Sequence, residues 1–199
     1  MRKPQASEIS TDGDLLRLSA KGDEDAFLIL YRRHQGLVFR FALHMSGSRD
    51  IAEEVTQEVF LSMLADAHQY SVERGPLESY LIGMARNQVR RQLRCLRPLG
   101  HGALDINCAA SIEAKDQVLN VLSTEQDLRA LRDAILKLPA NYREVIVLCD
   151  LEGMDYIQAA KQLGCAVGTV RSRLHRARGL LGAKLRSQDK LRTREGCPV

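Results

Sequence analysis

The stretch VGTVRSRLHRARGLL, residues 167–181, is rich in positive charge, and its apolar residues recur at helical spacing. It holds four arginines and a histidine but no acid, although the whole chain sets 29 basic residues against 25 acidic ones. At about 100° per residue, one face is apolar: Val170, Leu174, Ala177 and Leu181. The opposite face carries Arg171, Ser172, His175 and Arg176. Because guanidinium groups donate to guanine edges and phosphates, this stretch predicts a DNA-reading helix.

The residues around this helix have the layout of a helix-turn-helix. A short segment with the small residues Ala159 and Ala160 ends at Gly164, which predicts a tight turn. Arg173 and Arg178 fall on the flanks of the second helix, where guanidinium groups would meet phosphates, and Thr169 lies in its first turn. A solvated basic face is the alternative, but the missing acids, the small residues and the glycine turn favour DNA.

A second basic helix is predicted in SYLIGMARNQVRRQLRCLR, residues 79–97. Its apolar residues fall on one side, and acids are absent after Glu78. The outward DNA-binding candidates are Asn87, Arg90, Arg91 and Arg94. A solvated face is again the alternative, but two such helices in one chain favour a single extended polyanion as ligand.

The segment SRDIAEEVTQEVFLSML, residues 48–64, has the opposite charge. Its outward side is acidic, and the apolar residues Phe60, Leu61 and Leu64 fall outside the apolar stripe. Apolar side chains among acids predict a protein-binding surface rather than a DNA contact, with scattered exposed apolar residues as the alternative. The candidate residues are Asp50, Glu53, Glu54, Gln57, Glu58, Phe60 and Leu61.

Catalytic and metal chemistry find little support in the sequence. No nucleophile, base and orienting acid come together, and no glycine-rich phosphate loop is present, so we expect no catalytic residue and no cofactor. Five scattered cysteines without a CxxC pair argue against a disulfide framework. Cys95, His101 and Cys108 offer an alternative zinc site, but their spacing matches no standard motif, and we expect no metal.

The periodicity that positions these residues is helical throughout, which predicts an all-α protein. We expect two small helical domains, residues 12–97 and 124–186, joined by a flexible linker at 98–123 and followed by a polar tail at 187–199. No run approaches the ~18 apolar residues of a membrane span, so we expect a cytoplasmic protein without membrane insertion.

The order of these segments resembles the bacterial RNA polymerase sigma factors of the extracytoplasmic-function group, in the sigma-70 family. DAFLILYRRHQGLVFRFA and DIAEEVTQEVFLSM resemble the start of domain 2 and its polymerase-binding helix. SYLIGMARNQVRRQLR resembles the helix that engages the minus-10 promoter element. LPANYREVIVLCDLEGMDYIQAAKQLGCAVGTVRSRLHRAR resembles domain 4, which reads the minus-35 element. The resemblance covers residues 12–97 and 124–186.

The resemblance implies a promoter-specificity subunit that binds core RNA polymerase, both at the β′ clamp helices and at the β subunit. It implies that the acidic helix docks on the clamp, that the helix with Asn87 lies near the site of melting, and that residues 71–77 lie close to a flipped base. An anti-sigma factor is a further implied partner. An operator-binding helix-turn-helix regulator that acts without polymerase is the alternative function.

Three departures from the family pattern stand out. Tyr80 occupies the position of the usual tryptophan, and the chain contains no tryptophan. Cys165 and Ala166 replace the usual residues at the turn, and alanine is a poor N-cap. Ile157 and Gln158 replace a usual pair of acids.

Overall fold

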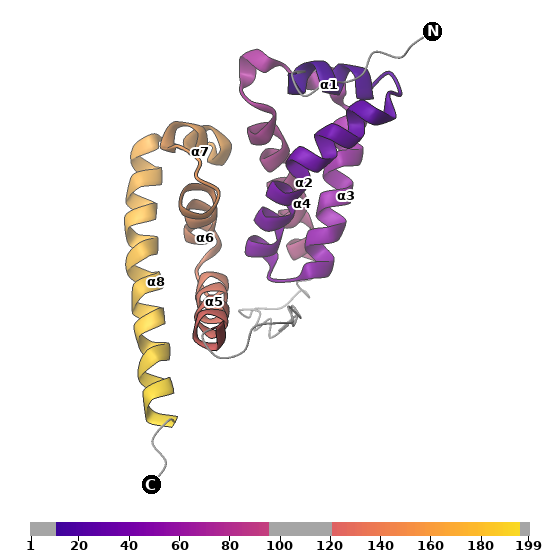
Figure 1. The fold of residues 1–199 in the computed structure, drawn as a ribbon. Helices are drawn as coiled ribbons and strands as arrows, with labels where there is room; N and C mark the ends of the chain where they lie inside the picture. Colours follow the sequence, from indigo (N-terminus) through magenta and orange to yellow (C-terminus); the bar gives the residue numbers. More distant parts are fainter. Residues whose placement is uncertain (1–10, 96–120, 196–199) are drawn as a thin grey trace. The chain divides into compact units, whose positions relative to one another are not determined.

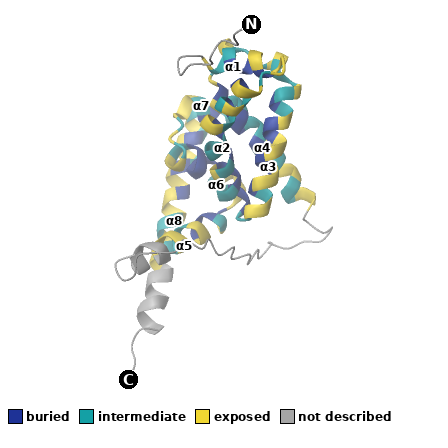
Figure 2. Ribbon diagram, turned by 45° about the vertical axis from the view of Figure 1, so that its right-hand side comes forward, coloured by how far each residue is buried: buried dark blue, intermediate teal, exposed yellow. Residues whose placement is uncertain are grey.

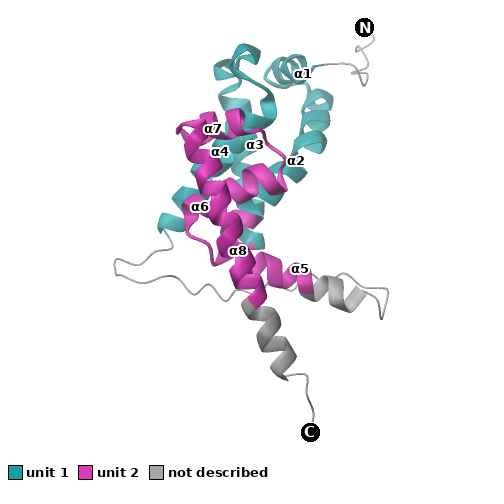
Figure 3. Ribbon diagram, turned by 90° about the vertical axis from the view of Figure 1, so that its left-hand side faces the viewer, with its two compact units in different colours: residues 1–43, 49–104 teal, residues 44–48, 105–199 magenta. Residues whose placement is uncertain are grey.

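The computed structural model describes residues 11–95 and 121–195, and every regular element in these ranges is helical (Figure 1). The prediction of an all-α protein is therefore confirmed for this part of the chain. Two compact units form, residues 1–43 with 49–104 and residues 44–48 with 105–199 (Figure 3). None of the described helices combines the length and the apolar character needed to cross a membrane.

In residues 11–95, the first unit has four helices and two short 3₁₀ turns. They are α1 (Asp12–Ser19), α2 (Glu24–Ser46), α3 (Arg49–Ala65), η1 (Ala67–Gln69), η2 (Val72–Arg74) and α4 (Leu77–Cys95). The last three residues of α2 belong to the second unit. The Thr11 hydroxyl accepts a hydrogen bond from the Asp14 N–H and so caps the start of α1. Gly75, at φ 134°, and Pro76 separate the turns from α4, as their sequence predicts.

The apolar stripes of the helices pack together and form the core of the first unit (Figure 2). The predicted stripes of α2, α3 and α4 are buried at Leu30, Val38, Phe41, Ala52, Val55, Val59, Met63, Leu81, Ile82, Ala85 and Val89. Helices α3 and α4 pack directly against each other. The inward face of each helix is thereby fixed, and its charged face points outward.

Phe60 lies in this core, and the prediction that it belongs to an exposed docking face was wrong. Its side chain is 2% exposed and meets the Tyr31 ring edge-on, with centroids 4.8 Å apart. Phe27 adds a second edge contact, at 6.3 Å. The buried side of α3 is therefore wider than the predicted stripe, because α2 supplies aromatic rings that cover the flank of α3.

Over residues 121–195, the second unit shows four helices and one π-helical turn. They are α5 (Val121–Leu136), α6 (Ala140–Ile146), η3 (Val147–Leu151), α7 (Tyr156–Leu163) and α8 (Val167–Glu195). Helix α8 packs on α5, α6 and α7. Most of the predicted linker, residues 98–120, lies outside the described residues, and α5 begins at Val121, within the last residues of that linker.

Two helix ends differ from the sequence prediction. Residues 140–151, whose apolar spacing predicts one helix, form α6 and then the wider turn η3, where the Glu152 N–H donates to the Val147 carbonyl before Gly153 ends the segment at φ 68°. Helix α8 continues to Glu195, so most of the predicted tail at 187–199 is helical. The physical reason is that no glycine or proline interrupts residues 183–195.

Candidate nucleic-acid and protein-binding interfaces

The predicted DNA-reading helix forms the first part of α8, and its two faces divide as the sequence predicts. Val170, Leu174 and Ala177 are at most 2% exposed, whereas Leu181 is half-buried. The outward residues Arg171, Ser172, His175 and Arg176 are all exposed. The rigid backbone of one helix thus presents two arginines, a histidine and a hydroxyl to solvent, which is the geometry required to enter a major groove.

The turn between α7 and α8 is held by hydrogen bonds at both helix ends. Asp155 caps α7, because its Oδ1 accepts from the N–H groups of Ile157 and Gln158, each at 2.8 Å. Gly164 ends α7 in the left-handed region at φ 64°, where other residues are strained. The Ala166 carbonyl accepts the first bonds of α8, from Thr169 and Val170. These features establish a helix-turn-helix.

Arg178 lies on the flank of α8 but is already paired within the protein. Its Nε donates to Asp150 Oδ2 at 3.0 Å, and its Nη2 donates to Oδ1 at 2.6 Å. Hydrogen bonding to Asp150, followed by its charge, raises the pKa of Arg178, and Tyr156 adds to the rise. The sequence alone could not reveal this pair, because its members lie 28 residues apart.

The remaining predicted residues of α8 differ in their surroundings. Arg171 lies over the Tyr156 ring, 5.9 Å from its centroid. The Ser172 hydroxyl donates to the Thr169 carbonyl at 3.0 Å, which is an intrahelical bond. Arg173 and Thr169 are half-buried. Arg176 is exposed on the same outward face as Ser172 and His175 and is a base-reading candidate there.

The second basic surface lies on α4, within the first unit. Asn87, Arg90, Arg91 and Arg94 are exposed, and the predicted inward residues Leu81, Ile82, Ala85 and Val89 are buried. Arg94 Nε donates to the Arg90 carbonyl one turn earlier, at 3.1 Å. All four candidates are thus accessible on one helix, in the arrangement expected for a contact with a polyanion.

Two tyrosines lie together, Tyr70 from the segment before α4 and Tyr80 from the first turn of α4. Tyr70 and Tyr80 stack at a tilt, with centroids 5.7 Å apart, and the Tyr70 hydroxyl donates to the Gly75 carbonyl at 3.3 Å. Burial raises the pKa of both phenols, and the neighbouring carboxylates Asp12 and Asp66 add to the rise at Tyr70 and Tyr80 respectively. The rings therefore stay neutral at physiological pH and offer a stacking surface at the start of α4.

The acidic surface lies on α3. Its exposed members are Asp50, Glu53, Glu54, Gln57, Glu58 and Leu61. Leu61 is 64% exposed, an apolar side chain beside the acids, as predicted. Glu54 accepts a hydrogen bond from Gln92 Nε2 at 2.6 Å, which ties this surface to α4. The surface suits a basic protein partner and would repel DNA.

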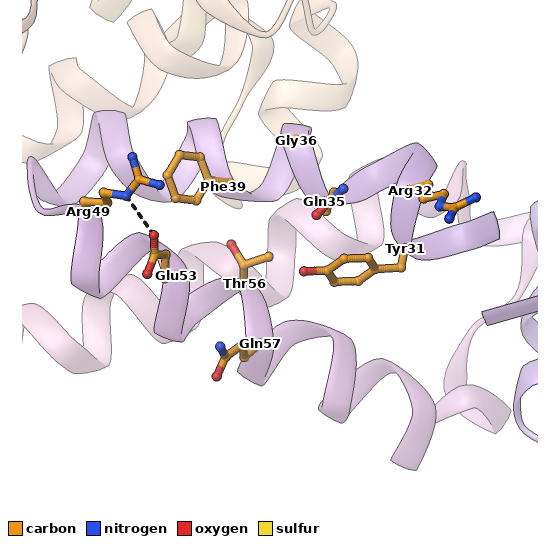
Figure 4. A pocket seen from close by; sticks show the side chains of 9 residues that line it. All are labelled: Tyr31, Arg32, Gln35, Gly36, Phe39, Arg49, Glu53, Thr56 and Gln57. Carbon is orange, nitrogen blue, oxygen red and sulfur yellow. Dashed lines mark hydrogen bonds and ion pairs between the residues drawn. The ribbon is translucent and has the colours of Figure 1, made fainter. Parts of the chain in front are cut away.

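A groove of about 540 Å³ runs between α2 and α3 beside these acids (Figure 4). Tyr31, Gln35 and Phe39 face it from α2, and Thr56 and Gln57 face it from α3. Arg49 closes one end: its Nε donates to Glu53 Oε1 at 2.8 Å, and its guanidinium lies 6.0 Å from the Phe39 ring centroid.

Sequence reasoning missed this groove. The spacing of Arg49 and Glu53 was its one readable signal, since residues four apart face each other on a helix. The α2 side of the groove had no comparable signal, because Phe39 lies outside the apolar stripe that helical spacing predicts for α2, which runs through Leu30, Val38 and Phe41.

The alternative zinc site gains no support. The described residues contain no group of three or more His, Cys, Asp or Glu side chains that could hold a metal. Cys95 is exposed at the end of α4, whereas His101 and Cys108 lie outside the described residues. Burial raises the pKa of the Cys149 thiol, which therefore stays protonated at neutral pH.

Comparison with known proteins matches both units to family models. The model described as Sigma-70 region 2 matches residues 30–98, and the model described as Sigma-70, region 4, matches residues 128–181. The first match contains α3 and α4 with their charged surfaces, and the second contains the helix-turn-helix.

Several curated proteins resemble the chain over both units. The ECF RNA polymerase sigma factor SigE of Mycolicibacterium smegmatis is 33% identical over 153 residues, which cover 75% of this chain and 57% of that protein. EcfG of Rhodopseudomonas palustris is 34% identical over 145 residues, covering 73% and 77%. SigW of Bacillus subtilis is 27% identical over 174 residues, covering 83% and 92%.

Solved structures share the fold. CnrH, determined in complex with the cytosolic domain of CnrY, superposes with a TM-score of 0.67 at 25% identity, over 89% of this chain and 99% of that one. The sigma factor RpoE of Bartonella quintana, determined with the anti-sigma factor NepR, gives a TM-score of 0.60 at 24% identity, over 80% and 96%.

Proposed function

Because the chain belongs to the extracytoplasmic-function group of the sigma-70 family, we propose that it is a promoter-specificity subunit that binds core RNA polymerase through α3 and promoter DNA through α4 and α8. The proposal rests on one observation: the same chain contains a helix-turn-helix with a basic outer face and a helix with an exposed acidic face. DNA explains the first feature only, and the acidic face, with the exposed Leu61 among its acids, suits a basic protein partner.

On the polymerase side, the acidic surface of α3 and the adjoining groove support docking on the β′ clamp helices, with a further contact to the β subunit. Asp50, Glu54, Gln57 and Glu58 supply exposed acceptors, and Leu61 supplies apolar area. Glu53 and Arg49 already pair with each other, so a basic partner group would compete with Arg49 for Glu53. Phe60 acts from the core, by supporting the Tyr31 ring that lines the groove.

On the DNA side, two contacts are proposed. Asn87, Arg90, Arg91 and Arg94 of α4 lie against the minus-10 region, where the stacked Tyr70 and Tyr80 rings offer a surface for an unpaired base. The minus-35 element is read by Ser172, His175 and Arg176 of α8, with Arg171 beside them. Arg173 and Thr169 lie near the phosphate backbone of the DNA.

Two further features complete the proposal. The solved relatives were determined with an anti-sigma factor or with a cytosolic domain of another protein, which supports an anti-sigma factor as a partner of this chain too. Since polymerase and promoter meet in the cytoplasm, the chain acts there. It carries out no catalytic step, because the polymerase performs the chemistry.

An operator-binding regulator is the competing function, and binding to DNA alone separates the two. We expect the full chain to bind a promoter duplex weakly by itself and tightly after core polymerase is added. Run-off transcription from a library of promoter fragments should then give discrete start sites. Tight, selective binding without polymerase, or no binding of core polymerase at low and moderate salt, would contradict the proposal.

The outward face of α8 gives a residue-level prediction. Arg176→Ala should change the preference at one base pair of the upstream element by about 1–3 kcal/mol, because a guanidinium reads a base edge. Arg173→Ala should instead weaken all promoters alike and reduce the salt slope by about 1, as loss of a phosphate contact does. The measurement is binding of the polymerase complex to a panel of single-base variants. If both variants lost affinity uniformly across the panel, the assignment of Arg176 to the base-reading face and of Arg173 to the phosphate-contacting flank of α8 would be wrong.

A further inference from the structure

An acidic residue lies beside the arginines of α8, where DNA-binding surfaces normally exclude negative charge. Asp150, in η3, is the partner of Arg178, and their two side chains are 29% and 56% exposed. Most exposed ion pairs contribute little to the stability of the folded protein, but a bidentate pair fixes both side chains in one plane. The two hydrogen bonds, of 3.0 and 2.6 Å, form such a pair.

The geometry of this pair competes directly with DNA binding. A guanidinium grips a phosphate with the same two-pronged edge, Nε and Nη2, that Arg178 gives to Asp150. While the pair lasts, that edge is unavailable and the local charge is neutralised. Arg178 therefore differs from Arg171, Arg173 and Arg176, although its position on the helix flank predicts a phosphate contact.

A second contact holds α8 from the same side. Tyr156, the first residue of α7, packs its ring against Arg171, seven residues before Arg178 and thus two helical turns away on the same side of α8. Asp150 and Tyr156 lie on either side of the turn between η3 and α7. One short segment thereby contacts α8 at two points along its length, which adds to the restraint that the buried Val170, Leu174 and Ala177 place on rotation of the helix.

We propose that Asp150 is a positioning residue for promoter selectivity: it withdraws Arg178 from the phosphates and, with Tyr156, fixes the rotation of α8 so that Ser172, His175 and Arg176 face the bases. The proposal rests on the proposed function and adds to it. Selectivity improves because one sequence-independent phosphate contact is suppressed while the base-reading face is held in place.

The test uses the full chain assembled with core polymerase, on a selected promoter duplex, its single-base variants and an unrelated duplex. Asp150→Ala frees Arg178 to bind phosphate. We expect selectivity for the promoter over the unrelated duplex to fall at least about threefold, and the salt slope to steepen by about 1. Asp150→Asn, which keeps the shape but not the charge, should act in the same direction and covers the case in which the alanine variant folds poorly.

The variant Arg178→Ala tests whether the arginine acts as the positioning partner of Asp150 or as a phosphate contact. As a positioning partner, its loss should lower selectivity without changing the salt slope. The double variant Asp150→Ala/Arg178→Ala should lose no more selectivity than Arg178→Ala alone, because the residues act as a unit. Asp133→Ala, which removes an exposed acid of α5, is the matched control and should change neither quantity. Circular dichroism and thermal unfolding establish that each variant is folded.

Two results would overturn the proposal. The first is a uniform loss of affinity with a shallower salt slope in Arg178→Ala, which identifies a phosphate contact. The second is unchanged selectivity in both Asp150 variants. A wild-type chain that fails to bind polymerase or to select promoters would instead contradict the proposed function itself, and is measured first.

Discussion

Replacing Phe60 by alanine is expected to lower the free energy of unfolding of the first unit by about 3–5 kcal/mol, the usual cost of removing a buried phenyl ring. The side chain is 2% exposed, and it makes edge contacts with the rings of Tyr31 and Phe27. Urea unfolding followed by circular dichroism measures the effect. The loss is large because removing the ring leaves a cavity that the surrounding structure fills only partly.

Leu61→Ala is the matched control, one residue further along α3. Leu61 is 64% exposed, so its removal should change the free energy of unfolding by no more than about 0.5 kcal/mol. It should nevertheless weaken polymerase binding if the apolar area is part of the docking surface. Equal stability losses in the two variants would contradict the assignment of Phe60 to the core and Leu61 to the surface.

Reversing the charge of Glu58 is expected to weaken binding to core polymerase by about 2–5 kcal/mol, with little change in stability. Glu58 is exposed on the acidic surface of α3, and a lysine there would meet the basic groups expected on the partner. Affinity of Glu58→Lys for core polymerase, measured at two salt concentrations, tests this. The deficit should shrink as salt rises, because screening weakens the repulsion.

Asp25→Lys gives the same change of charge in the first turn of α2 and serves as the control. It should cost no more than about 1 kcal/mol of stability, through the helix dipole, and leave polymerase affinity nearly unchanged. If both variants lost affinity equally, net charge rather than a defined acidic surface would govern docking. If Glu58→Lys bound normally, α3 would not be the docking helix.

The local features of this protein follow closely from its sequence. Helical periodicity predicts which sides of α4 and α8 are buried, because neighbours three and four residues apart share a face whatever the fold. Asp155, Gly164 and Gly153 mark helix ends through bonds and backbone angles that involve only nearby residues. The charge of each outward face, and hence its class of partner, needs no tertiary information.

Tertiary structure decided the features that join residues far apart in the chain. The sequence placed Phe60 on the flank of α3, but only the aromatic rings of α2 made that flank interior. The α2–α3 groove likewise exists only once two helices pack. By its spacing, Arg178 is predicted to contact phosphate, as is Arg173. Only the folded chain brings Asp150, 28 residues earlier, to accept hydrogen bonds from its guanidinium. Periodicity fixes the direction in which a side chain points, whereas its partner depends on which other segment packs there.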